Sequence, residues 1–250
     1  MGPGIFLEGP DLLFDTTDEI RIMLNRASVS HIGGVIYTHW HPDHTAGWRI
    51  LEILNTAPEG GGVQSNTAVY IPEAVWHDFE NQQQVGMAAN LNFLARDGLV
   101  CNTILKDKQP IQIGDWLLEA IPMNNAFVSM YAFLVEWKST RLLLAVDHVQ
   151  GWQPPARLAN VDVAVLESGW SDYRPDGTET KLGEHFRRTK TSLDDVLRIV
   201  QRLKPKRTFL THIPEYYGWT YDDYMALQRD LASEYPGLVF AYDGLVVNLV

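Results

Sequence analysis

The chain has 250 residues, of which 46% are hydrophobic and 20% are charged, and its formal net charge at pH 7 is −11. This length suffices to bury a sizeable core, and single α/β domains of this size are common, so we expect one domain over residues 1–250. The acidic balance argues against an extended nucleic-acid surface, because phosphate backbones are bound by surfaces rich in lysine and arginine.

The cysteine and hydropathy patterns bear on cellular location. The single cysteine, Cys101, excludes an internal disulfide bond and is typical of a reducing environment. No apolar run approaches the ~18 residues that a membrane helix requires, and the N-terminus lacks the basic and apolar regions of a signal peptide. We therefore expect a soluble, cytoplasmic protein that does not contact a membrane.

Apolar periodicity and turn signals predict alternating strands and helices in the first half of the chain. Thr17 is the expected start of the first helix, and Pro72 is expected in the first turn of a later one, where proline is favoured. The glycine-rich stretch 58–65 predicts a loop. The expected elements are strands at 11–16, 34–38 and 68–71, and helices at 18–26, from near 45 and from near 72.

The second half continues in the same way. Residues 131–137 and 141–147 are predicted to pair as a hairpin through the turn at 138–140, and 162–167 is predicted to be a buried strand. Helices are expected at 192–203 and 221–235, on either side of a strand at 207–211. Periodicity alone thus indicates a mixed α/β chain.

The densest group of potential metal ligands directly follows the strand expected at 34–38. Alternate residues of an extended chain point the same way, so His39 and His41 can bind one ion, while the turn that follows brings Asp43 and His44 toward a second. A coincidental surface cluster is the alternative, but histidines rarely crowd in this way beside a buried strand. The run Thr38-His39-Trp40-His41-Pro42-Asp43-His44 therefore predicts a site for two metal ions.

This His-x-His-x-Asp-His pattern resembles the signature of the metallo-β-lactamase fold. The resemblance implies a four-layer αββα sandwich in which further ligands follow later strands. Asp147 ends the apolar run 141–146 and His212 ends 207–211, so both occupy places where the fold keeps ligands, at the carboxyl ends of strands.

Sequence motifs in the C-terminal part of the chain resemble those of one branch of this fold. The segment Pro205-Lys-Arg-Thr-Phe-Leu-Thr-His212-Ile, with Tyr221-Asp-Asp-Tyr224 and Ala241-Tyr-Asp-Gly244-Leu, is similar to phosphoribosyl cyclic phosphate phosphodiesterases, with the tRNase Z nucleases as more distant relatives. The similarity covers roughly residues 11–250. It implies two divalent ions, zinc or manganese, and an Asp43 that hydrogen-bonds the attacking water. The implied ligands are His39, His41, Asn125 and Asp147 for the first ion, and Asp43, His44, His212 and Asp147 for the second.

Asn125 departs from this pattern, because the family has a histidine there. An amide oxygen is a weaker donor to zinc than imidazole, so the ion held by His39 and His41 should bind less tightly or be a harder ion such as manganese. His148 could take the place of the missing histidine only if the strand end twists, because side chains of adjacent strand residues diverge.

A second departure lies at Lys190, where relatives have a histidine thought to act as general acid. Lys190 can hold a phosphate as a point charge, although an unperturbed lysine with a pKa of about 10.4 gives up its proton reluctantly at neutral pH. His185 is the alternative acid. The basic residues around 187–190 either meet an anionic substrate or form an ordinary solvated face.

The third departure is at the N-terminus. The family normally begins with an extra strand and a glycine-rich loop upstream of the segment 11–15, for which residues 1–4 leave no room. We therefore expect that the usual first strand is missing and that one edge of the sheet is exposed.

These observations leave three hypotheses about function. The first is a metal-dependent phosphodiesterase, which would use a metal-activated water to cleave a small anionic phosphodiester of a cyclic or nucleotide-like kind. Such an enzyme could form a homodimer. The second is a thioester or lactone hydrolase that uses the same ligands. The third is a catalytically weakened binding protein, suggested by Asn125 and Lys190.

Glu167, at a strand end, either orients a metal-bound histidine or caps a loop.

Overall fold

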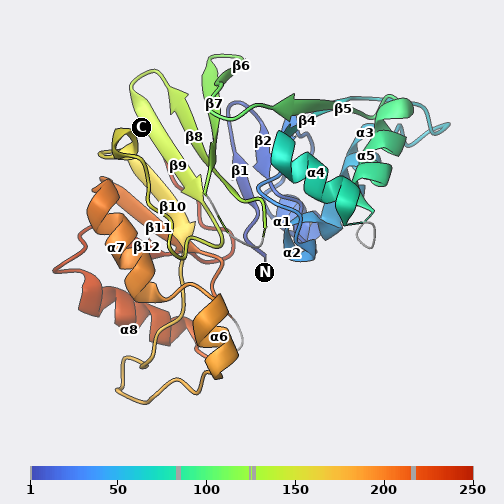
Figure 1. The fold of residues 1–250 in the computed structure, drawn as a ribbon. Coiled ribbons are helices and arrows are strands. Elements are labelled where there is room, and N and C mark those ends of the chain that lie inside the picture. The colour runs from blue at the N-terminus through green and yellow to red at the C-terminus, as the bar shows by residue number, and fades with distance from the viewer. Residues whose placement is uncertain (1, 83–85, 124, 126–127, 215–217, 250) are drawn as a thin grey trace. The chain divides into compact units, whose positions relative to one another are not determined.

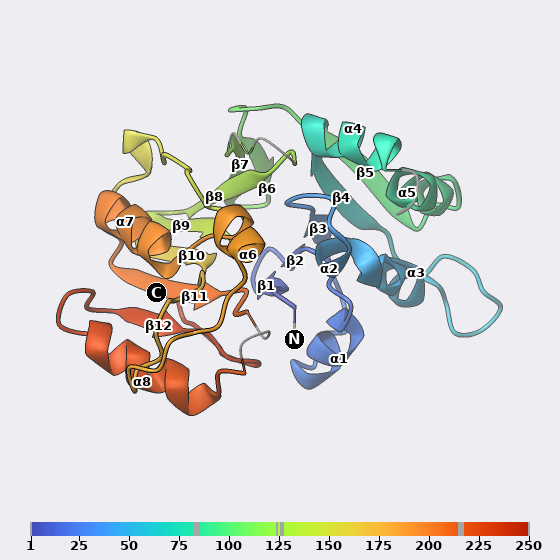
Figure 2. The ribbon, with the colours of Figure 1, turned by 60° about the horizontal axis from the view of Figure 1, so that its bottom comes forward.

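The computed structural model of the protein describes residues 2–82, 86–123, 125, 128–214 and 218–249. The chain divides into two compact units, Met1–Tyr131 and Ala132–Val250 (Figures 1 and 2). Each unit combines a β-sheet with helices, which confirms the predicted α/β class.

The first unit is built on a five-stranded sheet of order β1-β2-β3-β4-β5. β1 is antiparallel to β2, and the remaining neighbours pair in parallel. Every residue of β2 and β3 is buried, as expected of parallel strands covered on both faces. The strands are β1 (Ile5–Leu7), β2 (Leu12–Phe14), β3 (Gly34–Ile36), β4 (Thr67–Pro72) and β5 (Val100–Leu105).

The rest of residues Met1–Tyr131 forms helices and a hairpin. Its helices are α1 (Ile20–Arg26), α2 (Pro42–Thr45), the 3₁₀ turn η1 (Ala46–Trp48), α3 (Arg49–Asn55), α4 (Glu73–Asn81) and α5 (Met87–Arg96). The antiparallel hairpin consists of β6 (Ile111–Ile113) and β7 (Trp116–Pro122). The short helix α2 begins at Pro42, so His39 and His41 lie in the loop between β3 and α2, whereas Asp43 and His44 lie in α2 itself.

The second unit contains a mixed sheet of strands β8 to β12. β8 (Tyr131–Trp137) is antiparallel to β9 (Thr140–Ala145), as the hairpin prediction required. β9, β10 (Val163–Glu167), β11 (Arg207–Thr211) and β12 (Leu238–Phe240) are parallel neighbours in that order. Because carboxyl ends of parallel strands meet at one edge, residues that follow β9, β10 and β11 gather there.

The described part of the second unit also contains the helical segments η2 (Ala156–Leu158), α6 (Glu184–Thr189), α7 (Leu193–Leu203) and α8 (Tyr221–Leu231). Ser192 and Asp195 form a reciprocal capping box that starts α7, and Thr220 and Asp223 do the same for α8. Along α7, apolar residues recur on one face and are buried, which explains why this helix was predicted from periodicity.

Most predicted elements are confirmed, with shifted ends. The expected start of the first helix at Thr17 is wrong: α1 begins at Ile20, and the Thr17 hydroxyl donates to Met23 Sδ at 3.5 Å instead of capping the helix. The helix expected at 221–235 ends at Leu231. No strand was expected upstream of residues 11–15, but β1 lies there and pairs with β2 at the sheet edge. The sequence also did not predict β5, β6, β7, β12, α5 and α6.

No helix within the described ranges is long and apolar enough to cross a membrane.

Gly47 fixes how the segment after the motif packs in the first unit. Its N–H donates to Thr16 O at 2.9 Å, and a Cβ atom at this position would lie 2.2 Å from Thr17 O. We expect Gly47→Ala to lower the free energy of unfolding by about 1–3 kcal/mol, since a packed backbone must shift to admit the methyl group. Urea denaturation measures this change. Gly62→Ala is the control, because a Cβ there meets no atom within 4 Å; an equal loss at both positions would contradict the packing argument.

Candidate metal centre

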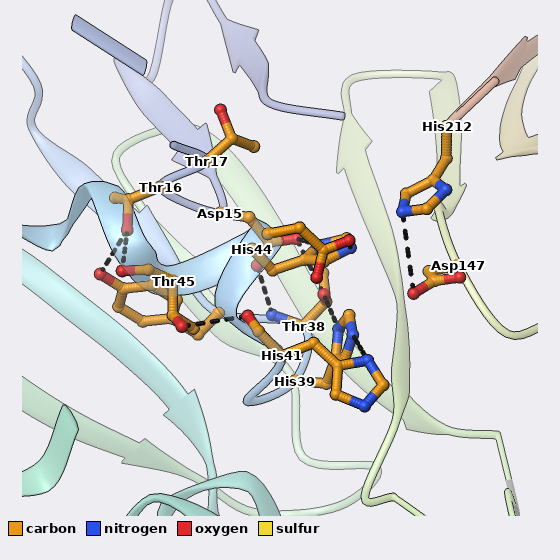
Figure 3. Close-up of polar contacts among 12 residues, drawn as sticks. Asp15, Thr16, Thr17, Thr38, His39, His41, His44, Thr45, Asp147 and His212 are labelled. Atoms are coloured by element: carbon orange, nitrogen blue, oxygen red, sulfur yellow. Dashed lines mark hydrogen bonds and ion pairs between the residues drawn. The ribbon is translucent and has the colours of Figure 1, made fainter. Parts of the chain in front are cut away.

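The three histidines of the motif in the first unit, His39, His41 and His44, lie close together (Figure 3). The ring centroid of His39 lies 4.6 Å from that of His41 and 4.1 Å from that of His44. Asp43 Oδ2 lies 3.7 Å from His44 Nε2. His39 and His44 are fully buried, whereas Asp43 is exposed. The structure thus brings together the three imidazoles and the carboxylate that were expected to act jointly.

Asp15 orients His44 directly and His39 through Thr38, and its carboxylate is fully buried. Its Oδ1 accepts the backbone N–H of Thr38 at 2.8 Å, and its Oδ2 accepts the Thr38 hydroxyl at 2.8 Å. The same Oδ2 lies 2.7 Å from His44 Nδ1. A carboxylate accepts only, so His44 carries its proton on Nδ1 and directs the lone pair of Nε2 away from Asp15.

The Thr38 hydroxyl extends this control to His39. It donates its single proton to Asp15 and therefore accepts from His39 Nδ1, which lies 2.9 Å away. His39 Nε2 then carries a lone pair, and it lies 3.0 Å from His41 Nδ1. Two nitrogen ligands at ~2.05 Å from a tetrahedral zinc ion are roughly 3.3 Å apart. The spacing of these two nitrogens therefore fits donors to one ion.

Sequence reasoning missed Asp15, although the strand pairing contains the signal. β2 and β3 are parallel neighbours, with Phe14 opposite Ile36. A polar residue that directly follows β2 therefore lies beside the first residues after β3. The backbone of Asp15 is left-handed, with φ of +60°, which turns its carboxylate toward Thr38.

In the second unit, Asp147 lies near two histidines. Asp147 Oδ1 accepts the backbone N–H of His148 at 2.7 Å, and its Oδ2 lies 3.9 Å from His212 Nε2 (Figure 3). Asp147 is buried and His212 is partly exposed. The structure thus brings Asp147 and His212 together at the edge of the sheet where β9 and β11 end, as the sequence predicted.

The side chain of His148 lies close to that of Asp147, which the sequence analysis allowed only if the strand end twists. β9 ends at Ala145, and the backbone of His148 is left-handed, with φ of +50°. Its side chain therefore does not diverge from that of Asp147, and Nε2 of His148 lies 3.4 Å from Asp147 Oδ2. His148 thus adds a third nitrogen or oxygen donor to the group in this unit.

Glu167 is buried beside this group. Burial and, second, the nearby Asp147 carboxylate raise the pKa of Glu167 to about 7, against the opposing effects of His212 and of the hydrogen bonds from Thr191 and Val149 N–H. The Thr191 bond is 2.6 Å long and the Val149 bond is 3.1 Å long. Of the two roles that the sequence left open for Glu167, these hydrogen bonds fit the capping of a loop, because its carboxyl group accepts from a loop N–H and a hydroxyl.

Three further residues were predicted to belong to the site, namely Asn125, His185 and Lys190. Asn125 is half-buried, and its Oδ1 accepts the N–H of Val128 at 3.3 Å, so the amide oxygen is engaged within its own loop. Its neighbours at 124, 126 and 127 lie outside the described residues. His185 is exposed on α6, and Lys190 follows that helix with its carbonyl bound to Trp170 Nε1 at 3.0 Å. Their roles in the site stay predictions.

Comparison with known proteins places these features in a family. The sequence matches the family described as Beta-lactamase superfamily domain over residues 9–213. A comparison with curated protein sequences found no match. Among solved structures, the metallo-β-lactamase fold protein YhfI from Bacillus subtilis is 17% identical, with a TM-score of 0.71 over 98% of this chain and 90% of that one.

Two further solved structures share this fold. A diphosphatase from the PhnP family is 21% identical, with a TM-score of 0.66 over 98% of this chain and 83% of that one. Human tRNase Z, short form, is 15% identical, with a TM-score of 0.66 over 99% of this chain and 91% of that one. These likenesses confirm the fold that the motif predicted. The chain belongs to the Beta-lactamase superfamily domain family and has the metallo-β-lactamase fold.

Proposed function

We propose that this chain is a metal-dependent hydrolase that cleaves small phosphodiesters. The observation that carries the proposal is the orientation of two buried imidazoles: Asp15 and Thr38 fix the Nδ1 protons of His39 and His44, which leaves Nε2 of each as a donor. Such outer contacts are the usual companions of metal-binding histidines. Membership of the family supports a hydrolytic metal centre.

The proposed ligands follow the family pattern. We assign His39, His41 and Asp147 to one ion, with Asn125 or His148 as the remaining ligand, and Asp43, His44, His212 and Asp147 to the other. Imidazole and carboxylate ligands suit zinc, and an amide in place of an imidazole would favour manganese. Divalent ions at these residues would supply a bound water of lowered pKa and would withdraw charge from the phosphoryl oxygen.

The other side chains have separate roles. Asp43 is exposed and accepts a hydrogen bond from the attacking water, so it fixes the direction of the lone pair that attacks phosphorus. Lys190 places a positive charge near the departing oxygen, and His185 is the alternative proton donor. The proposed substrate is a small anionic molecule, because the net charge of −11 is unfavourable for a long polyanion.

Two of the similar structures support a phosphoryl substrate by their names, a diphosphatase and a tRNase. A thioester or lactone hydrolase is the alternative, since the same ligands can polarise a carbonyl oxygen. A weakened binding protein is the third possibility, and it rests on Asn125 and Lys190.

A substrate panel separates these three functions. Metal-loaded protein is offered bis(4-nitrophenyl) phosphate, an acyl-homoserine lactone and an acyl thioester at equal concentration. We expect turnover of the phosphodiester at a kcat/KM well above that for either carbonyl substrate. Cleavage of the lactone or thioester alone would contradict the proposal and favour the carbonyl class. If all three are untouched, Asn125→His and Lys190→His test for a weakened site, which these changes should reactivate.

A further inference from the structure

A buried junction in the second unit joins three segments of the chain. The Thr191 hydroxyl donates to Glu167 Oε2 at 2.6 Å, and the Val149 N–H donates to the same oxygen at 3.1 Å. The Gln150 N–H donates to Thr191 Oγ1 at 3.2 Å. The end of β10, the residue before the cap of α7 and the loop 147–150 therefore share one set of hydrogen bonds.

This junction is shielded from solvent. The exposed fraction is 6% for Glu167, 2% for Thr191 and 0% for Val149. A buried carboxylate is costly unless donors reach it, so Glu167 holds both of its donors firmly. Loss of the Thr191 hydroxyl would leave Glu167 with one donor and the Gln150 N–H without its acceptor.

Trp170 and Gly169 hold Thr191 in place from the other side. The backbone N–H of Trp170 donates to Thr191 O at 3.0 Å, and the backbone N–H of Leu193 donates to Trp170 O at 2.7 Å. Gly169 has φ of +69°, and a Cβ atom there would lie 2.6 Å from the carbonyl carbon of Ser192. The backbones of 169–170 and 191–193 thus touch directly, which leaves Thr191 little freedom to move.

The junction reaches the Asp147 carboxylate through the backbone of its loop. Asp147 Oδ1 accepts the N–H of His148, so the orientation of the carboxylate follows the loop backbone. The next two N–H groups of the loop, at Val149 and Gln150, are the ones that the junction binds. Three successive N–H groups are therefore fixed, one by Asp147 itself and two by Glu167 and Thr191.

We propose that Thr191 is a positioning residue for the metal centre, which holds the loop 147–150 through Glu167 and so sets the direction of the Asp147 carboxylate. The inference rests on the proposed function in one respect, namely that Asp147 is a metal ligand. Residues that orient ligands from outside typically change metal affinity by roughly 10- to 100-fold when they are removed.

Thr191→Val is the direct test, because valine keeps the shape of threonine and removes the hydroxyl. Zinc and manganese affinities of the full chain are measured by competition with a chromophoric chelator. We expect Thr191→Val to bind metal roughly 10-fold more weakly or worse. Thr191→Ser, which keeps the hydroxyl, should restore binding to within about twofold of the wild type.

Thr189→Val is the matched control. Thr189 is two residues away from Thr191, is exposed, and donates its hydroxyl proton to His185 O at 2.9 Å. The Thr189→Val variant therefore also loses one hydroxyl hydrogen bond. Equal metal affinities of Thr189→Val and Thr191→Val would overturn the proposal. Should Thr191→Val fail to fold in urea denaturation, Thr191→Ala, which places no methyl group against the carboxylate, gives the same test.

The readout separates this inference from the proposed function. A wild-type protein that binds metal but cleaves no phosphodiester would contradict the proposed function, while the difference in affinity between Thr191→Val and Thr189→Val would still support the positioning role. If the wild type cleaves phosphodiesters and Thr191→Val binds metal as tightly as the wild type does, only the positioning role is contradicted.

Discussion

Asp147→Ala is expected to lower phosphodiester turnover by about three orders of magnitude or more, which corresponds to roughly 4 kcal/mol of transition-state stabilisation. Asp147 is the carboxylate assigned to both ions, and it is buried beside His212 and His148. Its loss should therefore weaken both ions, whereas loss of a histidine weakens one. The measurements are kcat/KM with bis(4-nitrophenyl) phosphate and metal content per chain.

Two companion variants show whether the loss is local. His212→Ala should also abolish turnover but retain part of the bound metal, because His212 is assigned to one ion only. Cys101→Ala should leave turnover and metal content unchanged, because Cys101 is an exposed free thiol on β5. Equal damage from all three substitutions would indicate misfolding and would contradict the assignment of Asp147.

Asp15→Ala is expected to have the largest effect on stability, about 3–5 kcal/mol in the free energy of unfolding. The substitution removes the acceptor of the Thr38 N–H, the Thr38 hydroxyl and His44 Nδ1, and both Asp15 and His44 are fully buried. Buried donors that lose their acceptor cost more than the net value of the original bonds. Urea denaturation of metal-free protein measures the change without a contribution from bound ions.

The same substitution should weaken metal binding, because Nε2 of His39 and His44 is no longer fixed as the donor nitrogen. Asp18→Ala is the control, since Asp18 is exposed and lies three residues further along the chain; we expect a change within about 0.5 kcal/mol. If Asp15→Ala were as stable as Asp18→Ala, the account of Asp15 as the residue that orients the histidines would be wrong.

Strands with continuous apolar runs were predictable from the sequence. β10 and β11 are short runs of mostly buried residues that the pattern placed within one residue. β5 was missed because its interior residues, such as Cys101 and Ile104, are exposed or half-buried and show no simple alternation. β12 was also missed, although it is no shorter than β2 and β3, which were predicted. Local pattern fails where tertiary contacts, rather than periodicity, decide the strand.

The metal-ligand motif was likewise readable because its residues are adjacent in sequence, whereas the residues that orient it are not. Asp15 contacts His44 across 29 positions, and Thr191 contacts Glu167 across 24. The approach of His148 to Asp147 depends on a left-handed backbone, which residues other than glycine adopt rarely. Such contacts follow from the pairing of strands and from turn geometry, which one sequence does not reveal.

The most direct test of a metal-dependent phosphodiesterase is a titration of chelator-stripped protein with zinc and, separately, with manganese. Bound metal and hydrolysis of bis(4-nitrophenyl) phosphate are measured in the same samples. The account predicts no turnover in stripped protein and a return of activity in proportion to bound metal, with a plateau near two ions per chain. Full turnover after stripping, or saturation with both metals and no turnover in folded protein, would contradict it.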